Sequence, residues 1–139
     1  MDYREVTPAR EAVARLDHGA DWRSELEALA SALDAEAAWF TAIGAVEDAE
    51  LWYYDQDELE YEAVTFEEPL EVAACVGNVS WLEDERFAHT HAVLSRRSGQ
   101  TLAGHLNRAT VFAGEAHMRS FETPLERSHE EVTDLDLWL

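Results

Sequence analysis

The sequence contains no lysine, and all ten of its basic residues are arginines. Aspartate and glutamate together number 30, so the formal net charge is -20 at pH 7. In dilute buffer these carboxylates repel one another, but at about 1 M salt the Debye length falls to about 3 Å and the repulsion is screened. Because acidic residues occur in every segment, we predict a protein from a halophilic archaeon with a salty cytoplasm. An acidic interaction protein from an ordinary cell is the alternative.

Cysteine and long apolar runs are also scarce. Cys75 is the only cysteine, which excludes an internal disulfide, and its apolar neighbours predict a small buried side chain. The sequence shows no run of about 18 apolar residues, no apolar signal segment and no lipidation motif. We therefore expect a soluble, cytoplasmic protein that does not enter a membrane. With 139 residues, 47% of them hydrophobic, the chain is long enough to form one domain with its own core.

The motifs of several common enzyme classes are absent. The sequence has no GxxxxGKS, GxxxxGKT or GxGxxG phosphate-binding loop, no HExxH, no cysteine pairs for zinc and no GxSxG nucleophile turn. Adjacent carboxylates such as Glu67 and Glu68 indicate a solvated surface in so acidic a chain. Arg96 and Arg97 form a basic doublet. Their position in a predicted turn explains them as well as a nucleic-acid-binding site would.

Hydrophobic patterning predicts an α+β protein with a mainly antiparallel sheet and one main helix packed on it. After Asp21, a candidate N-cap, the apolar residues Leu26, Leu29, Ala30 and Leu33 recur at helical spacing. The other segments alternate in polarity or are rich in aromatic and β-branched residues, which is typical of strands. The expected strands cover residues 11–19, 37–55, 61–69, 70–81, 87–95 and 100–121. Gly44 interrupts residues 37–55, which are therefore either two strands or one bent strand.

Two segments are less regular. Residues 70–81, LEVAACVGNVSW, are apolar nearly throughout, which predicts a strand covered on both faces, with Gly77 and Asn78 as candidates for a bulge. The acidic residues 122–139 end in an alternating set of leucines. We expect this tail to dock as an edge strand or onto a neighbouring subunit.

Three of the six histidines lie in the stretch FAHTHAVLSRRSGQTLAGHL, residues 87–106. In a strand, His89 and His91 point to the same face, about 6–7 Å apart. The tetrapeptide RRSG, which ends in Gly99, predicts a turn that brings the strand of His105 beside them. Three imidazoles can bind one metal ion and leave a position open to water. An exposed polar face or a hydrogen-bonded core pair is the alternative.

Candidates for a fourth ligand follow from strand parity. Asn107, Glu115 and His117 follow His105 by an even number of residues, so they share its face of the strand if no bulge intervenes. A water molecule is a further candidate. Parity alone does not choose among them.

Four runs of the sequence occur in an order that is specific to one family: WFTAIGAVEDAELWYYD, TFEEPLEVAACVGNVSW, HTHAVLSRRSGQTLAGHL and NRATVFAGEAHMRSF. In this order they resemble the PPC domain, the plants and prokaryotes conserved domain, over about residues 9–121. Residues 1–8 are then a lead-in, and residues 122–139 are an acidic tail. One position departs from the family pattern, because Ala103 stands where its last histidine motif usually has glycine.

The resemblance implies an α+β fold similar to that of acetolactate decarboxylase, and an assembly that is usually a homotrimer. It also implies that His89, His91 and His105 hold a metal ion, expected to be zinc. Glu115 matches a recurring acidic position of the family, which makes it the preferred fourth ligand or general base.

For function, the resemblance implies a stand-alone PPC-domain protein that is a DNA-binding or regulatory module with an unknown ligand. The plant members contact DNA through AT-hooks of the Arg-Gly-Arg-Pro type, which this sequence lacks. DNA is also disfavoured as a partner because the net charge is negative and salt weakens phosphate contacts. The alternative is a small zinc-dependent enzyme that decarboxylates or hydrolyses a small oxo acid or ester, with Glu115 moving protons.

Overall fold

A computed structural model describes residues 1–138, which form eight strands and one helix. It confirms the expected α+β class, because a mainly antiparallel sheet dominates and one helix packs on it. The elements are β1 (Pro8–Leu16), α1 (Trp22–Ala32), β2 (Ala37–Asp55), β3 (Glu60–Phe66), β4 (Leu70–Leu82), β5 (Glu85–Ser95), β6 (Thr101–Phe121), β7 (Arg127–Glu130) and β8 (Leu135–Trp138). No helix within these 138 residues is long and apolar enough to cross a membrane.

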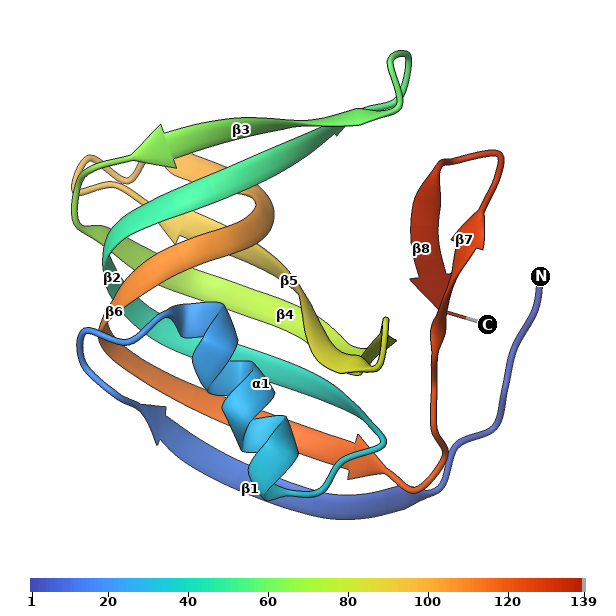
Figure 1. The fold of residues 1–139 in the computed structure, drawn as a ribbon. Coiled ribbons are helices and arrows are strands. Elements are labelled where there is room, and N and C mark those ends of the chain that lie inside the picture. The colour runs from blue at the N-terminus through green and yellow to red at the C-terminus, as the bar shows by residue number, and fades with distance from the viewer. Residues whose placement is uncertain (139) are drawn as a thin grey trace.

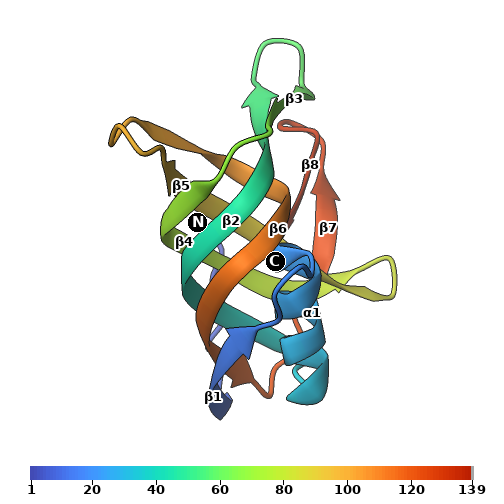
Figure 2. The same cartoon turned by 90° about the vertical axis from the view of Figure 1, so that its left-hand side faces the viewer.

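Four strands close into a small barrel (Figures 1 and 2). β4 pairs with β2 and β5, β5 pairs with β6, and β6 returns to pair with β2. β1 and β3 extend this sheet at its two edges. β2 and β6 contain 19 and 21 residues, and the register between them shifts at several points. Such irregularities let both long strands bend around the barrel.

Side chains from the inner faces of the strands fill the barrel. Among the largest are Phe40, Val79, Leu94, Leu106 and Met118, each with 2% or less of its surface exposed. Cys75 is also buried, as predicted. The prediction that residues 70–81 are covered on both faces is wrong, because β4 alternates between core and outer face and Val76 is 40% exposed. The bulge of β4 lies between Val72 and Ala74 rather than at Gly77.

Helix α1 begins directly after its predicted N-cap. The Asp21 carboxylate accepts a hydrogen bond from the backbone N–H of Ser24 at 2.9 Å, which satisfies one of the free donors at the helix start. Trp22, Leu26 and Ala30 are fully buried, and the helix packs against β5 and β6. The helix therefore covers one side of the barrel, beside the strands that carry the histidines (Figure 1).

The C-terminal segment forms a hairpin of its own instead of adding an edge strand to the main sheet. β7 and β8 pair with each other, and the hairpin stands beside the barrel (Figure 1). The backbone N–H of Trp81 donates to the carbonyl oxygen of Leu125 at 3.0 Å. The Tyr54 hydroxyl donates to the carbonyl oxygen of Thr133 at 2.5 Å. These two contacts hold the hairpin against β4 and against the β2–β3 hairpin of the same chain.

Candidate metal centre

The β5–β6 hairpin brings the three histidines together. The turn is closed by a hydrogen bond from the backbone N–H of Gly99 to the carbonyl oxygen of Arg96 at 2.8 Å. Gly99 has a φ of 84°, a conformation that glycine adopts without steric penalty. Across the two antiparallel strands His91 pairs directly with His105, and His89 lies two residues before His91 on β5. The predicted turn and the predicted neighbourhood of the three histidines are therefore confirmed.

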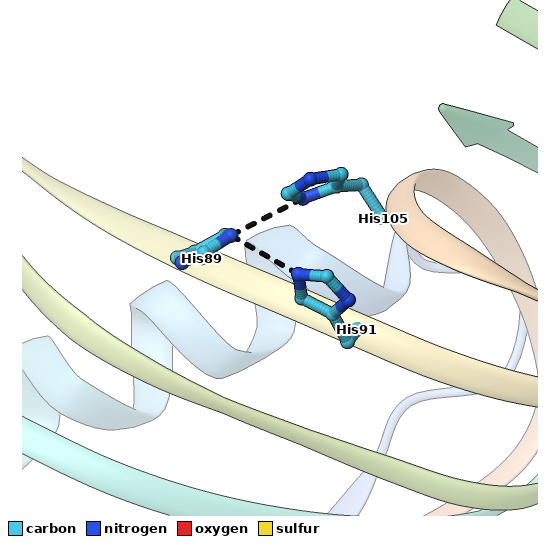
Figure 3. Close-up of side chains that lie close together, drawn as sticks. All are labelled: His89, His91 and His105. Carbon is cyan, nitrogen blue, oxygen red and sulfur yellow. Dashed lines mark hydrogen bonds between the residues drawn. The ribbon is translucent and has the colours of Figure 1, made fainter. Parts of the chain in front are cut away.

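The three imidazole rings point toward a common centre on the outer side of the barrel (Figure 3). The Nε2 atom of His89 lies 3.1 Å from Nδ1 of His105 and 3.3 Å from Nε2 of His91. One nitrogen from each ring lies within 4.8 Å of the others. The two rings from β5 and the one ring from β6 thus present three nitrogen atoms to one small volume.

These distances fit the ligands of a single metal ion. Zinc binds imidazole nitrogen at about 2.0–2.1 Å, and tetrahedral geometry then places two ligand nitrogens about 3.3–3.4 Å apart. The distances of 3.1 and 3.3 Å in this cluster are close to that value. An ion could therefore be bound with only small movements of the rings.

Burial keeps the three imidazoles neutral. For His89, burial is the largest cause and lowers the pKa to about 4, with smaller effects from the Arg127 guanidinium and the other two histidines. The pKa of His105 is also lowered to about 4, first by burial and then by His91. Burial lowers the pKa of His91 as well. At pH 7 the rings are therefore in the form that binds a metal ion.

Aromatic residues of the β2–β3 hairpin pack on the far side of His105. The Tyr61 hydroxyl lies 3.5 Å from Nε2 of His105, and the two rings meet edge to face with centroids 5.1 Å apart. Trp52 packs on Tyr61 with ring centroids 5.3 Å apart, and its indole N–H donates to the Glu50 carboxylate at 2.8 Å. These contacts fix the orientation of the His105 ring and leave its Nδ1 directed at the other two histidines.

A pocket of about 390 Å³ adjoins the histidines and is walled by five parts of the chain. They are the β5–β6 hairpin, helix α1, the β2–β3 hairpin, the end of β4 and the C-terminal hairpin. Asn107, which strand parity placed on the His105 face, does line this pocket, and its amide donates to the Glu50 carboxylate at 2.7 Å. Other lining residues are Arg23, Trp52, Tyr61, Leu82, Phe87, His89, His105, Arg127, Asp134, Leu135, Asp136 and Leu137.

The structure places Glu115 and His117 away from the three histidines. Both line a separate groove of about 560 Å³ between β1, β2 and β6, where Nε2 of His117 lies 2.7 Å from the Glu11 carboxylate. Register shifts between β2 and β6 interrupt strand parity, so Ala109 and Val111 are buried although they share the parity of His105. Glu115 and His117 still face away from the core, as expected. However, ten residues of extended strand span about 33 Å, so β6 carries Glu115 around the barrel and away from His105. Within one chain Glu115 does not complete the site, and its role as fourth ligand or general base remains a prediction that requires another subunit.

Several pocket residues were not predicted from the sequence. Tyr61 and Trp52 come from a hairpin rich in aromatic residues, and this enrichment could have indicated a packed aromatic wall. Arg23 and Arg127 carry no such signal, because one follows a helix N-cap and the other lies in the acidic tail. Their presence at the pocket depends on how the helix and the C-terminal hairpin dock.

The closed barrel, its single helix and the histidine hairpin define a small antiparallel β-barrel protein with a candidate three-histidine metal centre. The family model of the Plants and Prokaryotes Conserved (PCC) domain matches residues 3–122. The chain therefore belongs to this family, whose domain is also abbreviated PPC. Comparison with curated proteins gives no match.

Solved structures share the complete fold of this chain. A metal-containing protein from Archaeoglobus fulgidus is 36% identical, with a TM-score of 0.94 over 100% of this chain and 99% of that protein. A PPC protein from Pyrococcus horikoshii is 24% identical, with a TM-score of 0.92 over 100% and 97%. A protein from Bacteroides thetaiotaomicron, provisionally named DNA-binding, is 20% identical, with a TM-score of 0.86 over 96% of both chains.

The acetolactate decarboxylase of Bacillus subtilis shares the fold more distantly. It is 11% identical, with a TM-score of 0.56 over 86% of this chain and 55% of that enzyme. The expected similarity of fold is therefore confirmed. A shared fold at this identity does not transfer the chemistry of the decarboxylase to this protein.

Proposed function

We propose that this PPC-domain protein binds one zinc ion through Nε2 of His89, Nε2 of His91 and Nδ1 of His105. The observation that supports the proposal is the spacing of 3.1 and 3.3 Å between these nitrogens. Neutral imidazole is a preferred zinc ligand, and the burial that lowers the pKa of the rings keeps them neutral. The 36% identical relative from Archaeoglobus fulgidus is a metal-containing protein, which supports a metal at this site.

We further propose that the site binds a small molecule in the adjoining pocket. Tyr61 and Trp52 pack beside the His105 ring and, with Phe87, give the pocket an aromatic wall. When bound, zinc polarises a carbonyl or carboxylate oxygen and lowers the pKa of a coordinated water molecule. Two functions are compatible with such a site. One is a regulatory PPC module that responds to a small ligand, and the other is a small zinc-dependent decarboxylase or hydrolase of an oxo acid or ester.

Metal analysis tests the proposal directly. Protein purified in high salt should contain about one metal ion per chain, whereas His89→Ala and His105→Ala should lose it because each removes one of three ligands. His117→Ala is the matched control, since its imidazole lies in the separate groove and pairs with Glu11. A wild-type content below about 0.2 ions per chain after incubation with zinc would contradict both functions that use the metal.

DNA binding is the second candidate, and it is favoured by the provisional name of the relative from Bacteroides thetaiotaomicron. The physical argument opposes it, because a chain of formal charge -20 repels phosphates and high salt weakens the remaining contacts. A fluorescence titration with an A·T-rich duplex over a salt series is the test. Absence of binding at the lowest salt that keeps the protein folded would exclude this function.

A homotrimer remains our prediction for the assembly. The outer face of the barrel exposes apolar side chains beside the groove of Glu115, including Val13 at 82% and Ile43 at 55% exposure. Contact with another subunit would remove this surface from water. Light scattering during size exclusion in high salt should give three times the chain mass of 15.7 kDa, and a monomer would refute the prediction.

A further inference from the structure

Two arginines converge on the pocket beside the histidines. Arg23 comes from α1 and Arg127 from β7, and both guanidinium groups lie over the ring of Phe87, at 5.4 and 5.5 Å from its centroid. Both arginines line the same pocket as His89 and His105. In a chain that has only ten basic residues, two of them therefore flank one aromatic ring at the candidate metal centre.

The Arg127 guanidinium is held by few partners. One terminal nitrogen donates to the carbonyl oxygen of Asp136 at 2.9 Å, and the other donates to the Asn78 side-chain oxygen at 2.5 Å. Its Nε is buried and has no hydrogen-bond partner within residues 1–138. Since a guanidinium carries five N–H donors, it retains donors for an acceptor that enters the pocket.

Arg23 shows the same pattern. A terminal nitrogen donates to the Asn107 side-chain oxygen at 3.2 Å. Its Nε lies 3.6 Å from the Glu27 carboxylate, too far for a hydrogen bond, and is buried without a partner among the described residues. Neither guanidinium has all of its N–H donors paired, and the terminal nitrogens retain N–H groups for a ligand that supplies acceptor atoms.

A bound metal ion would remove the excess of negative charge around the pocket. Asp134 and Asp136 also line the pocket, and their carboxylates lie 3.3 and 3.8 Å from the His129 ring. The two aspartates and the two arginines cancel in formal charge, and the three histidines of the metal centre are neutral. Two further carboxylates contact lining residues: that of Glu27 lies 3.6 Å from Nε of Arg23, and that of Glu50 accepts a hydrogen bond from the Asn107 amide. A divalent ion would therefore bring the formal charge of these groups to about zero, in contrast to the rest of this acidic chain.

We infer that this pocket binds a small carboxylate, with one oxygen directed at the metal centre and the carboxylate held by Arg127 and Arg23. The inference rests on the proposed function and specifies its ligand class. Guanidinium groups bind carboxylates through paired hydrogen bonds, and a pocket of about 390 Å³ has the size for a small metabolite. Phosphate shares this acceptor chemistry and is the competing ligand.

The assignment gives the C-terminal hairpin a role in ligand binding. The family model ends at residue 122, so Arg127 comes from a segment beyond the matched domain. Its side chain reaches the barrel through Asn78 on β4 and Phe87 on β5. The hairpin is thus a wall of the pocket that supplies a determinant of ligand specificity.

Calorimetric titration with malonate and, separately, with inorganic phosphate tests the inference on metal-free and zinc-loaded protein. Ionic strength and chloride are held constant, because chloride competes for guanidinium groups. We expect malonate to bind zinc-loaded wild type, and Arg127→Met to weaken binding about 10- to 100-fold, as for loss of a charged hydrogen bond. The malonate affinity of Arg127→Lys should lie between those of wild type and Arg127→Met, because lysine retains the positive charge but cannot form paired hydrogen bonds. Arg97→Met, an exposed arginine on the β5–β6 turn, is the matched control and should bind as wild type.

Each outcome bears on the inference. Equal malonate affinity in wild type and Arg127→Met, or no malonate binding to zinc-loaded wild type, would overturn it. Tighter binding of phosphate than of malonate would overturn the carboxylate assignment. Metal content and melting temperature are measured for every variant. If Arg127→Met does not fold, the affinity of Arg127→Lys still tests the inference. If the protein binds no metal but binds malonate in an Arg127-dependent manner, the proposed metal centre fails while the anion site stands.

Discussion

Gly77 lies where two strands of the barrel approach each other closely, and Gly77→Ala tests whether this approach positions the metal centre. A Cβ atom at residue 77 would lie 2.1 Å from the backbone carbonyl oxygen of His89 and 2.5 Å from Cζ of Phe40. The first neighbour is backbone and the second is fully buried, so neither can move easily. The substitution therefore acts on the strand that carries two of the three histidines.

The size of the effect follows from the required movement. Carbon and carbonyl oxygen are normally about 3.3–3.6 Å apart, so β4 and β5 would have to separate by roughly 1.2–1.5 Å at Gly77. A shift of this size breaks the nearest backbone hydrogen bonds, each contributing about 0.5–1.5 kcal/mol, and loosens the packing on Phe40. We expect Gly77→Ala to lower the free energy of unfolding by about 3–5 kcal/mol. Zinc affinity should fall as well, because His89 moves with its backbone.

Urea unfolding in high salt measures the stability, and a competition titration with a zinc chelator measures the affinity. Gly99→Ala is the matched control, because a Cβ there meets nothing within 4 Å and only the φ of 84° is unfavourable. Gly99→Ala should lower the free energy of unfolding by about 1–2 kcal/mol and leave the zinc affinity unchanged. A Gly77→Ala protein that is as stable as Gly99→Ala, with wild-type zinc affinity, would refute the reasoning.

Three further predictions concern pH, the buried thiol and salt. Folding lowers the pKa of His89 and of His105 to about 4, so these histidines take up protons at higher pH in the unfolded chain than in the folded chain. The free energy of unfolding of the metal-free protein should therefore decrease as the pH falls from about 6.5 toward 4. Urea unfolding with a chelator present checks this, and the loss should be smaller in the double variant His89→Gln, His105→Gln. Burial raises the pKa of Cys75 to about 11, so Ellman's reagent at pH 8 should react slowly with the folded protein and rapidly with the protein in denaturant. Fast reaction of the folded protein would contradict the burial of Cys75. The melting temperature should rise with potassium chloride, whereas a salt-independent value would contradict adaptation to high salt.

Local features were predictable from the sequence because they depend on neighbouring residues. The Asp21 cap and the apolar stripe specify helix α1 within about three turns. The turn that ends in Gly99 fixes the pairing of the strands on either side, so the approach of His105 to His91 follows from a short stretch of chain. Most of the candidate metal centre is therefore encoded within residues 87–106.

Other parts of the site depend on contacts between distant segments. Register shifts in β6 interrupt the strand parity that relates Glu115 to His105, and the bending of β6 around the barrel places Glu115 in another groove. Closure of the barrel joins β2 to β6, and no local pattern reports a pairing between strands so far apart in the chain.

Sequence patterns alone were enough to predict the strongly acidic composition of the fold, the single helix, the hairpin of three histidines and the α+β class. The placement of Arg23 and Arg127 over the Phe87 ring, and of the C-terminal hairpin as a wall of the pocket, became evident from the folded chain. The physical reason is that hydrogen-bonded turns and caps act over a few residues, whereas docking depends on which surfaces the complete fold leaves open.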